Sequence, residues 1–469
     1  MKFRWKLFLT TLAIIYLLVL FSLYTQFHGP LAQLGYDRPK YQTEQLGYDR
    51  SPFHTQLVHK VSKIDKKVTF QKLYLQNINI SQDSTLKEWS KAETSFCENR
   101  FKGFAHLFAI LSDVFLDPSF SAGPPGGEEI KNVINQSEEK EFLILKPGYF
   151  QIQCKNKNFQ YMFPRSDHLA KWISALRPAL TFTSLEEDVH NITIAVTRYE
   201  YTNIYHTMTD WYNAFLMLLF FNMESLTANI LFVDSHPQGG LDSVWTTLFG
   251  EFIRAGQLKK PKHFKSLICS IQGYRSPMYD HFLPTLPHIE SFKHFFLSKH
   301  NIPLTKTLNC DKLSILFIWR RDYVAHPRNP KGLVSRKIKN ERDLQQFLQK
   351  FYPTHSIASV QTDKLSMQDQ LSAIANTDIL IGMHGAGLTL ALFLPKHGGL
   401  IELYPKYWSS DNHHFRAIAR WQNLHYRHWQ NLDGNNEFPD HYTHIPPSVI
   451  QTHVSAIIND MCKSKMKVK

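Results

Sequence analysis

A short strand-like segment that ends in a cluster of glycines constrains the fold most strongly. The segment 378–381 is followed by Gly382, Gly385 and Gly387, and then by the apolar segment 388–394. A strand, a tight turn and a helix in this order place backbone N–H groups and the positive end of a helix dipole beyond the strand's carboxyl end, where phosphates bind. The spacing differs from the G-x-G-x-x-G of dinucleotide folds, which argues against nicotinamide chemistry. The alternative is a turn that serves only close packing.

Short β-branched segments alternate with helix-like segments in two blocks. The first block has strand-like segments at 192–196 and 229–233 around a helix-like segment at 208–221. The second block begins at 313–318 and ends with a strand-like segment at 400–403. Such alternation is typical of parallel sheets with helices on both faces. We therefore expect an α/β protein with two Rossmann-like lobes and a central cleft.

The N-terminus is typical of a membrane anchor. Lys2, Arg4 and Lys6 precede an apolar segment at 7–24 that is at the short end of what spans a bilayer. By the positive-inside rule, the N-terminus is cytosolic and the remainder is lumenal or extracellular. A cleaved signal peptide is the alternative, but no A-x-A-like cleavage site follows the apolar segment.

These features predict five parts along the chain. We expect a cytoplasmic tail at 1–6, a transmembrane signal-anchor at 7–24 and a polar stem at 25–90. The two lobes are expected at 91–310 and 311–469, with a crossover near 304–312.

Sequons and cysteines agree with a lumenal location. N-glycosylation acceptors occur at Asn79, Asn135 and Asn191. The five cysteines include no C-x-x-C, which excludes a zinc site and a disulfide mini-scaffold but allows two bridges and one free thiol. The sequence does not specify which cysteines pair.

The formal net charge of +13 suggests an anionic ligand. A lumenal location argues against nucleic acid as a partner, whereas a nucleotide diphosphate is compatible with both the charge and the location. The alternative is that the charge serves only solubility.

The segment 200–212 lies where a strand is expected to give way to a helix. His206 and Asp210 are four residues apart and would share one face of a helix. Either could accept a proton from an attacking sugar hydroxyl. Alternatively, Thr209 or Asp210 caps the helix and His206 packs against Trp211.

Arginines follow the strand-like segment 313–318. Arg320 and Arg321 come directly after it, and Arg336 lies a little further on. Guanidinium groups bind phosphate oxygens in a bidentate manner, so these arginines are candidates for a diphosphate clamp. A solvated basic loop is the alternative.

Two further side chains come from the strands on either side of the glycine turn. His384 could bind a phosphate or stabilise a leaving group, and Glu402 could accept both hydroxyls of a ribose. Glu402 could instead serve as a helix cap or salt-bridge partner. No D-x-D occurs in the chain, so no carboxylate pair of the kind that holds a metal-bound diphosphate is present. We expect arginines and a helix N-terminus to neutralise the diphosphate without a metal.

Three motifs resemble glycosyltransferase family 61, and most resemble its β-1,2-xylosyltransferases, which modify the core of N-linked glycans. They are Y-H-T-M-T-D-W-Y at 205–212, R-D-Y-V-A-H-P-R at 321–328 and H-G-A-G-L-T at 384–389. The resemblance extends over about 190–460. The H-G-A-G-L element is shared across the family, whereas the other two are more specific to the xylosyl branch.

The resemblance implies a GT-B-type fold, a type II Golgi membrane topology and an inverting mechanism. It implies UDP-xylose as donor and the β-mannose of the N-glycan core as acceptor. The family's diphosphate-binding arginines map onto Arg320 or Arg321 and onto Arg336. Arg321 stands where an acidic residue is expected in the plant enzymes, so either arginine of the pair could face the diphosphate.

The resulting hypothesis assigns a role to each candidate residue. Asp210 would be the base, assisted or replaced by His206, and the lobe at 311–469 would bind the nucleotide sugar. The nucleotide-sugar site would comprise Arg320, Arg321, Arg336, His384, Gly385, Gly387 and Glu402. The acceptor site, in the lobe at 91–310, would use Trp211, Asp322 and His326.

Two other functions fit the same sequence. One is an O-linked N-acetylglucosaminyltransferase of the same family that uses UDP-N-acetylglucosamine. The other is a membrane-anchored glycan-binding protein without turnover. We expect no metal and no cofactor besides the donor.

Overall fold

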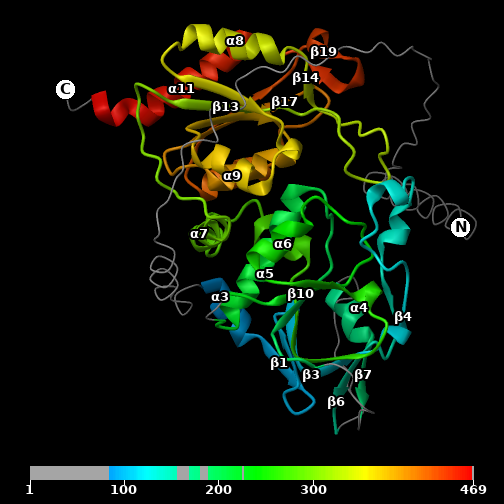
Figure 1. Ribbon diagram of the computed structural model, residues 1–469. Helices are drawn as coiled ribbons and strands as arrows, with labels where there is room; N and C mark the ends of the chain where they lie inside the picture. The colour runs from blue at the N-terminus through cyan, green and yellow to red at the C-terminus, as the bar shows by residue number, and fades with distance from the viewer. Residues whose placement is uncertain (1–83, 156–167, 180–187, 224–225, 467–469) are drawn as a thin grey trace, which may run out of the picture. The chain divides into compact units, whose positions relative to one another are not determined.

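The computed structural model describes residues 84–155, 168–179, 188–223 and 226–466, all within one compact unit (Figure 1). The predicted tail, the anchor, most of the stem and Asn79 lie outside these residues. No helix in the described residues is both long and apolar enough to cross a membrane. Asn135 and Asn191 are described, and both are exposed.

The second block of the sequence forms a five-stranded sheet in which every pair of neighbours is parallel. Its strands are β13 (Ser314–Ile318), β15 (Ser356–Val360), β16 (Ile379–Met383), β17 (Gly399–Tyr404) and β18 (His425–Gln430). Their order in space is β15-β13-β16-β17-β18, so the direction of winding reverses between β13 and β16. Ligands of open α/β sheets bind outside the carboxyl ends of the strands at such a reversal.

Both faces of this sheet are covered, because side chains alternate along each strand. Ile315 and Phe317 pack with α8 (Glu341–Phe351) and α11 (Pro447–Met466). Leu316 packs on the opposite face, in the core that contains α9 (Met367–Ala375) and α10 (His414–Trp421). Figure 1 shows α8 and α11 on one side of the sheet and α9 on the other.

The first sheet also contains a parallel part with a reversal. This part comprises β9 (Thr193–Val196), β10 (Asn229–Phe232), β11 (Phe252–Arg254) and β12 (Lys262–Cys269). Its order is β12-β9-β10-β11, so the winding reverses between β12 and β9. The helices α5 (Ile204–Phe220) and α6 (Asp242–Leu248) connect these strands.

The first sheet is mixed rather than wholly parallel, contrary to expectation. Strand β3 pairs antiparallel with β12 and extends the sheet through β2 to β1. These additional strands come from a part of the chain that shows no strand–helix alternation. They are β1 (Glu93–Phe96), β2 (Phe101–Phe104), β3 (Phe108–Leu116), β6 (Phe150–Gln153), β7 (Leu176–Ala179) and β8 (Asp188–Val189).

The remaining short elements lie outside the two large sheets. The helices are α3 (Ser84–Lys91) and α4 (His168–Ser174), and the strands are β4 (Ser121–Ala122), β5 (Ile144–Leu145), β14 (Lys337–Ile338), β19 (Glu437–Phe438) and β20 (Tyr442–Thr443).

One apolar core joins the two sheets along α5 and the glycine turn. Almost every residue of α5 is buried, and α5 shares a core with the 3₁₀-helix η10 (Ala386–Phe393). The helix α7 (Ile289–Lys299) belongs to the same core, and Lys293 Nζ on α7 donates to the Leu394 carbonyl. The last strand of the first sheet ends at Cys269 and the second sheet begins at Ser314, so the predicted crossover near 304–312 falls between them.

Two helices near the motifs begin earlier than predicted. The helix after the glycine turn is the 3₁₀-helix η10, which begins at Ala386 rather than 388. Helix α5 begins at Ile204, four residues before the predicted start, and Asn203 Oδ1 accepts from the Tyr205 N–H at 3.0 Å. Asn203 is therefore the N-cap, and the alternative that Asp210 caps this helix is wrong.

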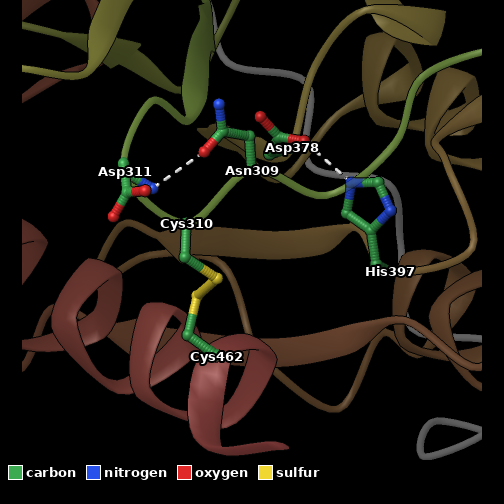
Figure 2. The surroundings of a disulfide bond; sticks show 6 residues. All are labelled: Asn309, Cys310, Asp311, Asp378, His397 and Cys462. Atoms are coloured by element: carbon green, nitrogen blue, oxygen red, sulfur yellow. Dashed lines mark hydrogen bonds and ion pairs between the residues drawn. A yellow bond between two sulfur atoms is a disulfide. The ribbon is translucent and has the colours of Figure 1, made fainter. Parts of the chain in front are cut away.

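The cysteines form two disulfides, as the sequence allows. Cys97 pairs with Cys154, and Cys310 pairs with Cys462, which ties the segment before β13 to α11 (Figure 2). Cys269 is free and buried at the end of β12. The bridge from Cys310 closes a loop of 152 residues, and long closed loops lose the most chain entropy in the unfolded state.

Candidate active site

Arg320 and Gly385 lie on either side of the reversal in the second sheet. Arg320 follows β13, and Gly385 follows β16. A Cβ atom at Gly385 would overlap the Arg320 guanidinium, so glycine is required here for the close approach of this side chain. The arginine therefore lies directly against the turn that leads into η10.

Arg336 is placed beside Arg320 by two aromatic side chains. Its backbone N–H donates to Tyr407 Oη at 2.9 Å, and its Cζ lies 4.1 Å from the centroid of the Trp408 ring. Its φ is 61°, a left-handed conformation that is unfavourable for arginine. A strained backbone conformation persists where surrounding contacts stabilise it. Here the contacts with Tyr407 and Trp408 do so, and they also position the Arg336 guanidinium.

Neither of the two guanidinium groups has a carboxylate partner among the residues that the structure describes. Arg320 Nε donates to the Ser335 carbonyl, and the charged or ionisable groups that influence its pKa are tyrosines, not carboxylates. Burial and the neighbouring Arg320 lower the pKa of Arg336 to about 10, so both side chains remain charged at neutral pH. Arg336 Nε is buried without an acceptor among the described residues. Two adjacent cations and an unsatisfied donor are the features of an anion site.

The structure distinguishes the two adjacent arginines. Arg321 points to α8, where its Nη2 lies 2.5 Å from Glu341 Oε2, and its side chain is largely exposed. The contact between Arg321 and the nucleotide sugar stays a prediction, and the geometry favours it less than a contact from Arg320, since the Arg321 guanidinium already has a carboxylate partner. Arg320 is the member of the pair at the strand-order reversal.

His384 and Glu402 form a buried pair. His384 Nδ1 lies 2.5 Å from Glu402 Oε1, and Tyr426 donates its hydroxyl to Glu402 Oε2 at 2.7 Å. Glu402 is fully buried and both of its oxygens are engaged, so the predicted contact with a ribose stays a prediction that this geometry does not favour. Its carboxylate instead orients the imidazole, whose Nε2 has no hydrogen bond to a described residue and remains for a ligand.

Imidazoles from both sheets gather beside this pair in what we call the histidine cluster, formed by His206, His281, His384 and His414. The ring centroid of His414 lies 4.3 Å from that of His281 and 6.2 Å from that of His384. His206 Nδ1 lies 2.9 Å from the hydroxyl oxygen of Tyr279, which also contacts His281. The cluster thus runs from the N-terminal part of α5 to the glycine turn.

Most of these imidazoles are neutral at neutral pH. Burial lowers the pKa of His206 and His281 below 6.5, and burial with the neighbouring His281 lowers that of His414 to about 3. A neutral imidazole has a nitrogen lone pair that can accept a proton. No group of three or more His, Cys, Asp or Glu in the described part of the chain is arranged as a metal site.

The Asp210 side chain is enclosed by the protein. This side chain is 1% exposed, and neither carboxylate oxygen accepts a hydrogen bond from another side chain of the described residues. Burial raises its pKa well above the usual value. A Cβ atom at Gly273, in the loop after β12, would lie 3.3 Å from Asp210 Oδ1. A sugar hydroxyl therefore has no direct path to this carboxyl. The base role predicted for Asp210 stays a prediction, and the geometry favours His206 over Asp210 for that role.

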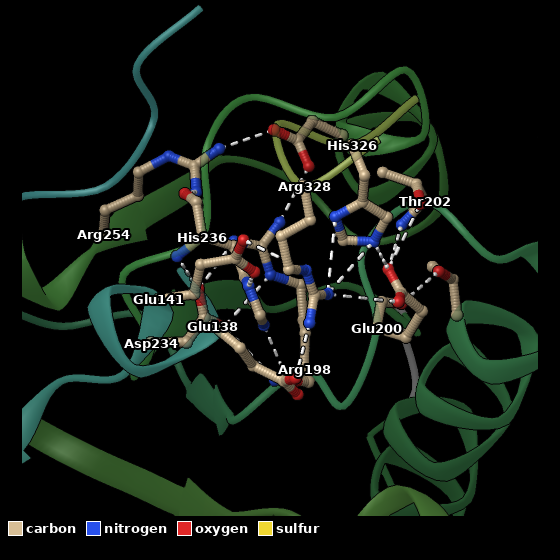
Figure 3. Close-up of polar contacts among 12 residues, drawn as sticks. Glu138, Glu141, Arg198, Glu200, Thr202, Asp234, His236, Arg254, His326 and Arg328 are labelled. Atoms are coloured by element: carbon tan, nitrogen blue, oxygen red, sulfur yellow. Dashed lines mark hydrogen bonds and ion pairs between the residues drawn. The ribbon is translucent and has the colours of Figure 1, made fainter. Parts of the chain in front are cut away.

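The three residues predicted for acceptor binding have other partners. Trp211 is fully buried against Trp245 and Phe296, so its contact with the acceptor stays a prediction that this burial does not favour. Asp322 accepts from Lys337 Nζ at 2.9 Å. His326 Nε2 lies 2.7 Å from Glu200 Oε1, and this contact links the segment after β13 to the segment after β9 (Figure 3).

A network of ion pairs supports this link. Burial alone would raise the pKa of Glu200, but its contact with His326 lowers that pKa to about 2. Arg198, two residues earlier, forms a buried ion pair with Asp234 at 2.7 Å (Figure 3). Because Arg198 follows β9 and Asp234 follows β10, the pair joins the carboxyl ends of adjacent strands.

Sequence reasoning missed His281 and His414. His281 lies in an irregular segment before α7, and His414 begins α10. Neither residue has a spacing that relates it to His206 or His384, so only the packing of the two sheets brings them together. The H-H-F-R sequence at 413–416 was a weak local signal, since two histidines at a helix start are unusual.

Comparison with known proteins agrees with this geometry. Residues 204–401 match the family model of glycosyltransferase 61, and the matched region begins with α5 and ends within β17. The chain contains a glycosyltransferase 61 domain. This domain holds His206, Arg320, Arg336 and His384. The family resemblance predicted from the three motifs is thus confirmed.

Sugar transferases are among the relatives of this chain. The chain is 27% identical over 369 residues to a β-1,2-xylosyltransferase of Oryza sativa subsp. japonica, covering 69% of this chain and 67% of the relative. It is 28% identical over 373 residues to a β-1,2-xylosyltransferase of Arabidopsis thaliana, covering 64% of this chain and 69% of the relative. An EGF domain-specific O-linked N-acetylglucosamine transferase of Drosophila melanogaster is 27% identical, covering 49% of this chain and 44% of the relative.

The adjacent arginines provide a matched test of the anion site. We expect Arg320→Ala to weaken UDP binding by about 10- to 150-fold, because it removes a charge-assisted contact. Arg321→Ala should leave UDP affinity within about twofold, since an exposed ion pair contributes little. Isothermal titration of UDP into each variant measures both effects. Equal losses in the two variants would contradict the assignment.

Proposed function

We propose that this glycosyltransferase transfers xylose from UDP-xylose to the 2-hydroxyl of the β-mannose in the N-glycan core, with inversion at the anomeric carbon. The anion site at Arg320 and Arg336 is the observation that supports a nucleotide diphosphate leaving group. The two β-1,2-xylosyltransferase relatives, each aligned over about two thirds of its own length, favour xylose as the sugar.

The diphosphate would bind at the reversal in the second sheet. Arg320, Arg336 and the N–H groups at the start of η10 would contact its oxygens, and a His384 imidazole protonated on both nitrogens would donate Nδ1–H to Glu402 and Nε2–H to the departing UDP. These groups stabilise the negative charge that develops as the bond between the anomeric carbon and the phosphate oxygen breaks. Two guanidinium groups supply the charge that a metal ion supplies in other transferases, so we propose that no metal is required.

His206 is our candidate for the base. The 2-hydroxyl of mannose attacks the anomeric carbon from the face opposite to UDP, and its proton passes to a neutral imidazole nitrogen of His206. The electron pair of the broken bond leaves with UDP. Asp210 lies one turn further along α5. In this proposal it would not contact the sugar and would only support the part of α5 that carries His206.

We further propose a GT-B arrangement and a Golgi location with type II topology. The two sheets, each with a strand-order reversal, support the former. The basic residues before the apolar segment 7–24 support an anchor, and two disulfides are typical of an oxidising compartment such as the secretory lumen.

Sugar transfer by the full-length protein tests this function. We expect an N-glycan with the unsubstituted core mannose to gain one pentose, by mass, from UDP-xylose in the presence of EDTA. A gain of N-acetylhexosamine from UDP-N-acetylglucosamine would instead favour the second family activity. Binding of UDP or glycan without transfer from either donor would indicate a glycan-binding protein. Loss of transfer in EDTA would contradict metal independence.

Substitutions on α5 test the base. We expect His206→Ala to lower kcat by about 10²- to 10⁴-fold, because general base catalysis contributes that much. Asp210→Asn should lower kcat by less than about tenfold, since an enclosed neutral carboxyl does not take the proton in this account. In the wild type, the acid limb of kcat/KM should lie below pH 6.5, because burial lowers the pKa of His206. The reverse order of effects would identify Asp210 as the base.

A further inference from the structure

Two tyrosines flank the reversal in the first sheet. Tyr199 lies three residues beyond the end of β9, and Tyr274 belongs to the 3₁₀-helix Gly273–Arg275 that follows β12. The winding of the sheet reverses between these two strands. The rule that places ligands outside the carboxyl ends of strands at a reversal therefore applies here as well.

Both rings are exposed although they form an ordered pair. Tyr199 is 53% exposed and Tyr274 is 45% exposed. Their centroids lie 5.2 Å apart in an edge-to-face arrangement, and Gln272 Nε2 donates to the Tyr274 hydroxyl. Large aromatic rings that are positioned by neighbours yet left open to solvent are typical of ligand-binding surfaces.

The pair is continuous with the proposed reaction centre. The Tyr199 ring contacts the His206 ring edge to face, with centroids 4.9 Å apart. Ring contacts then lead from His206 through Tyr279 and His281 to His414, and from there to His384 at the anion site. In this series the tyrosine pair and the arginines stand at opposite ends, with His206 between them. A molecule that presents a hydroxyl to His206 and extends away from the diphosphate would therefore pass over the tyrosines.

We propose that Tyr199 and Tyr274 form a subsite for a hexopyranose of the acceptor oligosaccharide, next to the sugar that accepts the transferred residue. A pyranose presents a face of C–H groups that packs on an aromatic ring, while its hydroxyls point outward to polar groups. Gln272, which contacts the Tyr274 hydroxyl, is a polar side chain beside the pair. This subsite rests on the proposed function, because it takes His206 as the point where the acceptor hydroxyl reacts.

The chemistry of the pair favours an acceptor sugar over the uracil of the donor. The donor diphosphate would bind to two arginines that lie between β13 and β14, near the second sheet. Both tyrosines instead follow strands of the first sheet. An edge-to-face pair also presents one ring face and one ring edge, which suits a non-planar sugar better than a planar base.

Kinetics of the full-length protein test the subsite. We expect Tyr199→Ala and Tyr274→Ala each to raise the KM for the N-glycan acceptor by about five- to 20-fold, with the KM for UDP-xylose within about twofold of wild type. Tyr199→Phe and Tyr274→Phe keep the ring and should stay within about threefold. Phe351→Ala removes an aromatic ring of 48% exposure on α8 and serves as the matched control. An unchanged acceptor KM, or an equal rise in both KM values, would overturn the subsite.

Binding without turnover separates this inference from the proposed reaction. Saturation-transfer NMR with the free N-glycan oligosaccharide reports contact whether or not a sugar is transferred. If the wild type transfers no pentose but binds the oligosaccharide, and only the alanine variants lose that binding, the reaction fails and the subsite stands. If the wild type transfers pentose while all tyrosine variants bind and react normally, the reaction stands and the subsite fails. No binding of the oligosaccharide by the wild type would overturn the subsite.

Discussion

Two adjacent guanidinium groups without a carboxylate partner are the feature on which the rest of the site depends. Other buried arginines of this chain are neutralised internally, as Arg198 is by Asp234. Arg320 and Arg336 are instead held together by a glycine turn, an aromatic face and a strained backbone. Contacts that force like charges together are costly to stability, and an anionic ligand relieves that cost. In our proposal, a bound diphosphate supplies the negative charge that these two side chains lack.

The shared apolar core holds elements of both sheets next to the proposed anion site. Helix α5 is buried on nearly all sides and packs against η10, so His206 on the first and His384 beside the second cannot move independently. The contact between His326 and Glu200 adds a polar link between the same two parts of the chain. The proposed base and the proposed leaving-group site therefore lie on elements that pack together, as the proposed in-line displacement requires.

The sequence allowed the parallel second sheet, the parallel part of the first sheet and the glycine turn to be predicted, because each depends on a local pattern. It failed where roles depend on partners far away in the chain. Glu402 lies at a strand position where a carboxylate could bind a ribose, yet its two oxygens contact His384 and Tyr426. Arg321 and Arg320 are equivalent in sequence, and only Glu341 on α8 distinguishes them. His281, like the antiparallel strands that precede β9, had no periodicity from which to infer its neighbours.

The most direct test of the central claim is a crystal structure of the protein with UDP. The account predicts diphosphate oxygens within hydrogen-bond distance of Arg320 and Arg336, next to the backbone of Gly385, with Arg321 still bound to Glu341. A diphosphate held by Arg321, or by the arginines beside β9 and β11 in the first sheet, would contradict it.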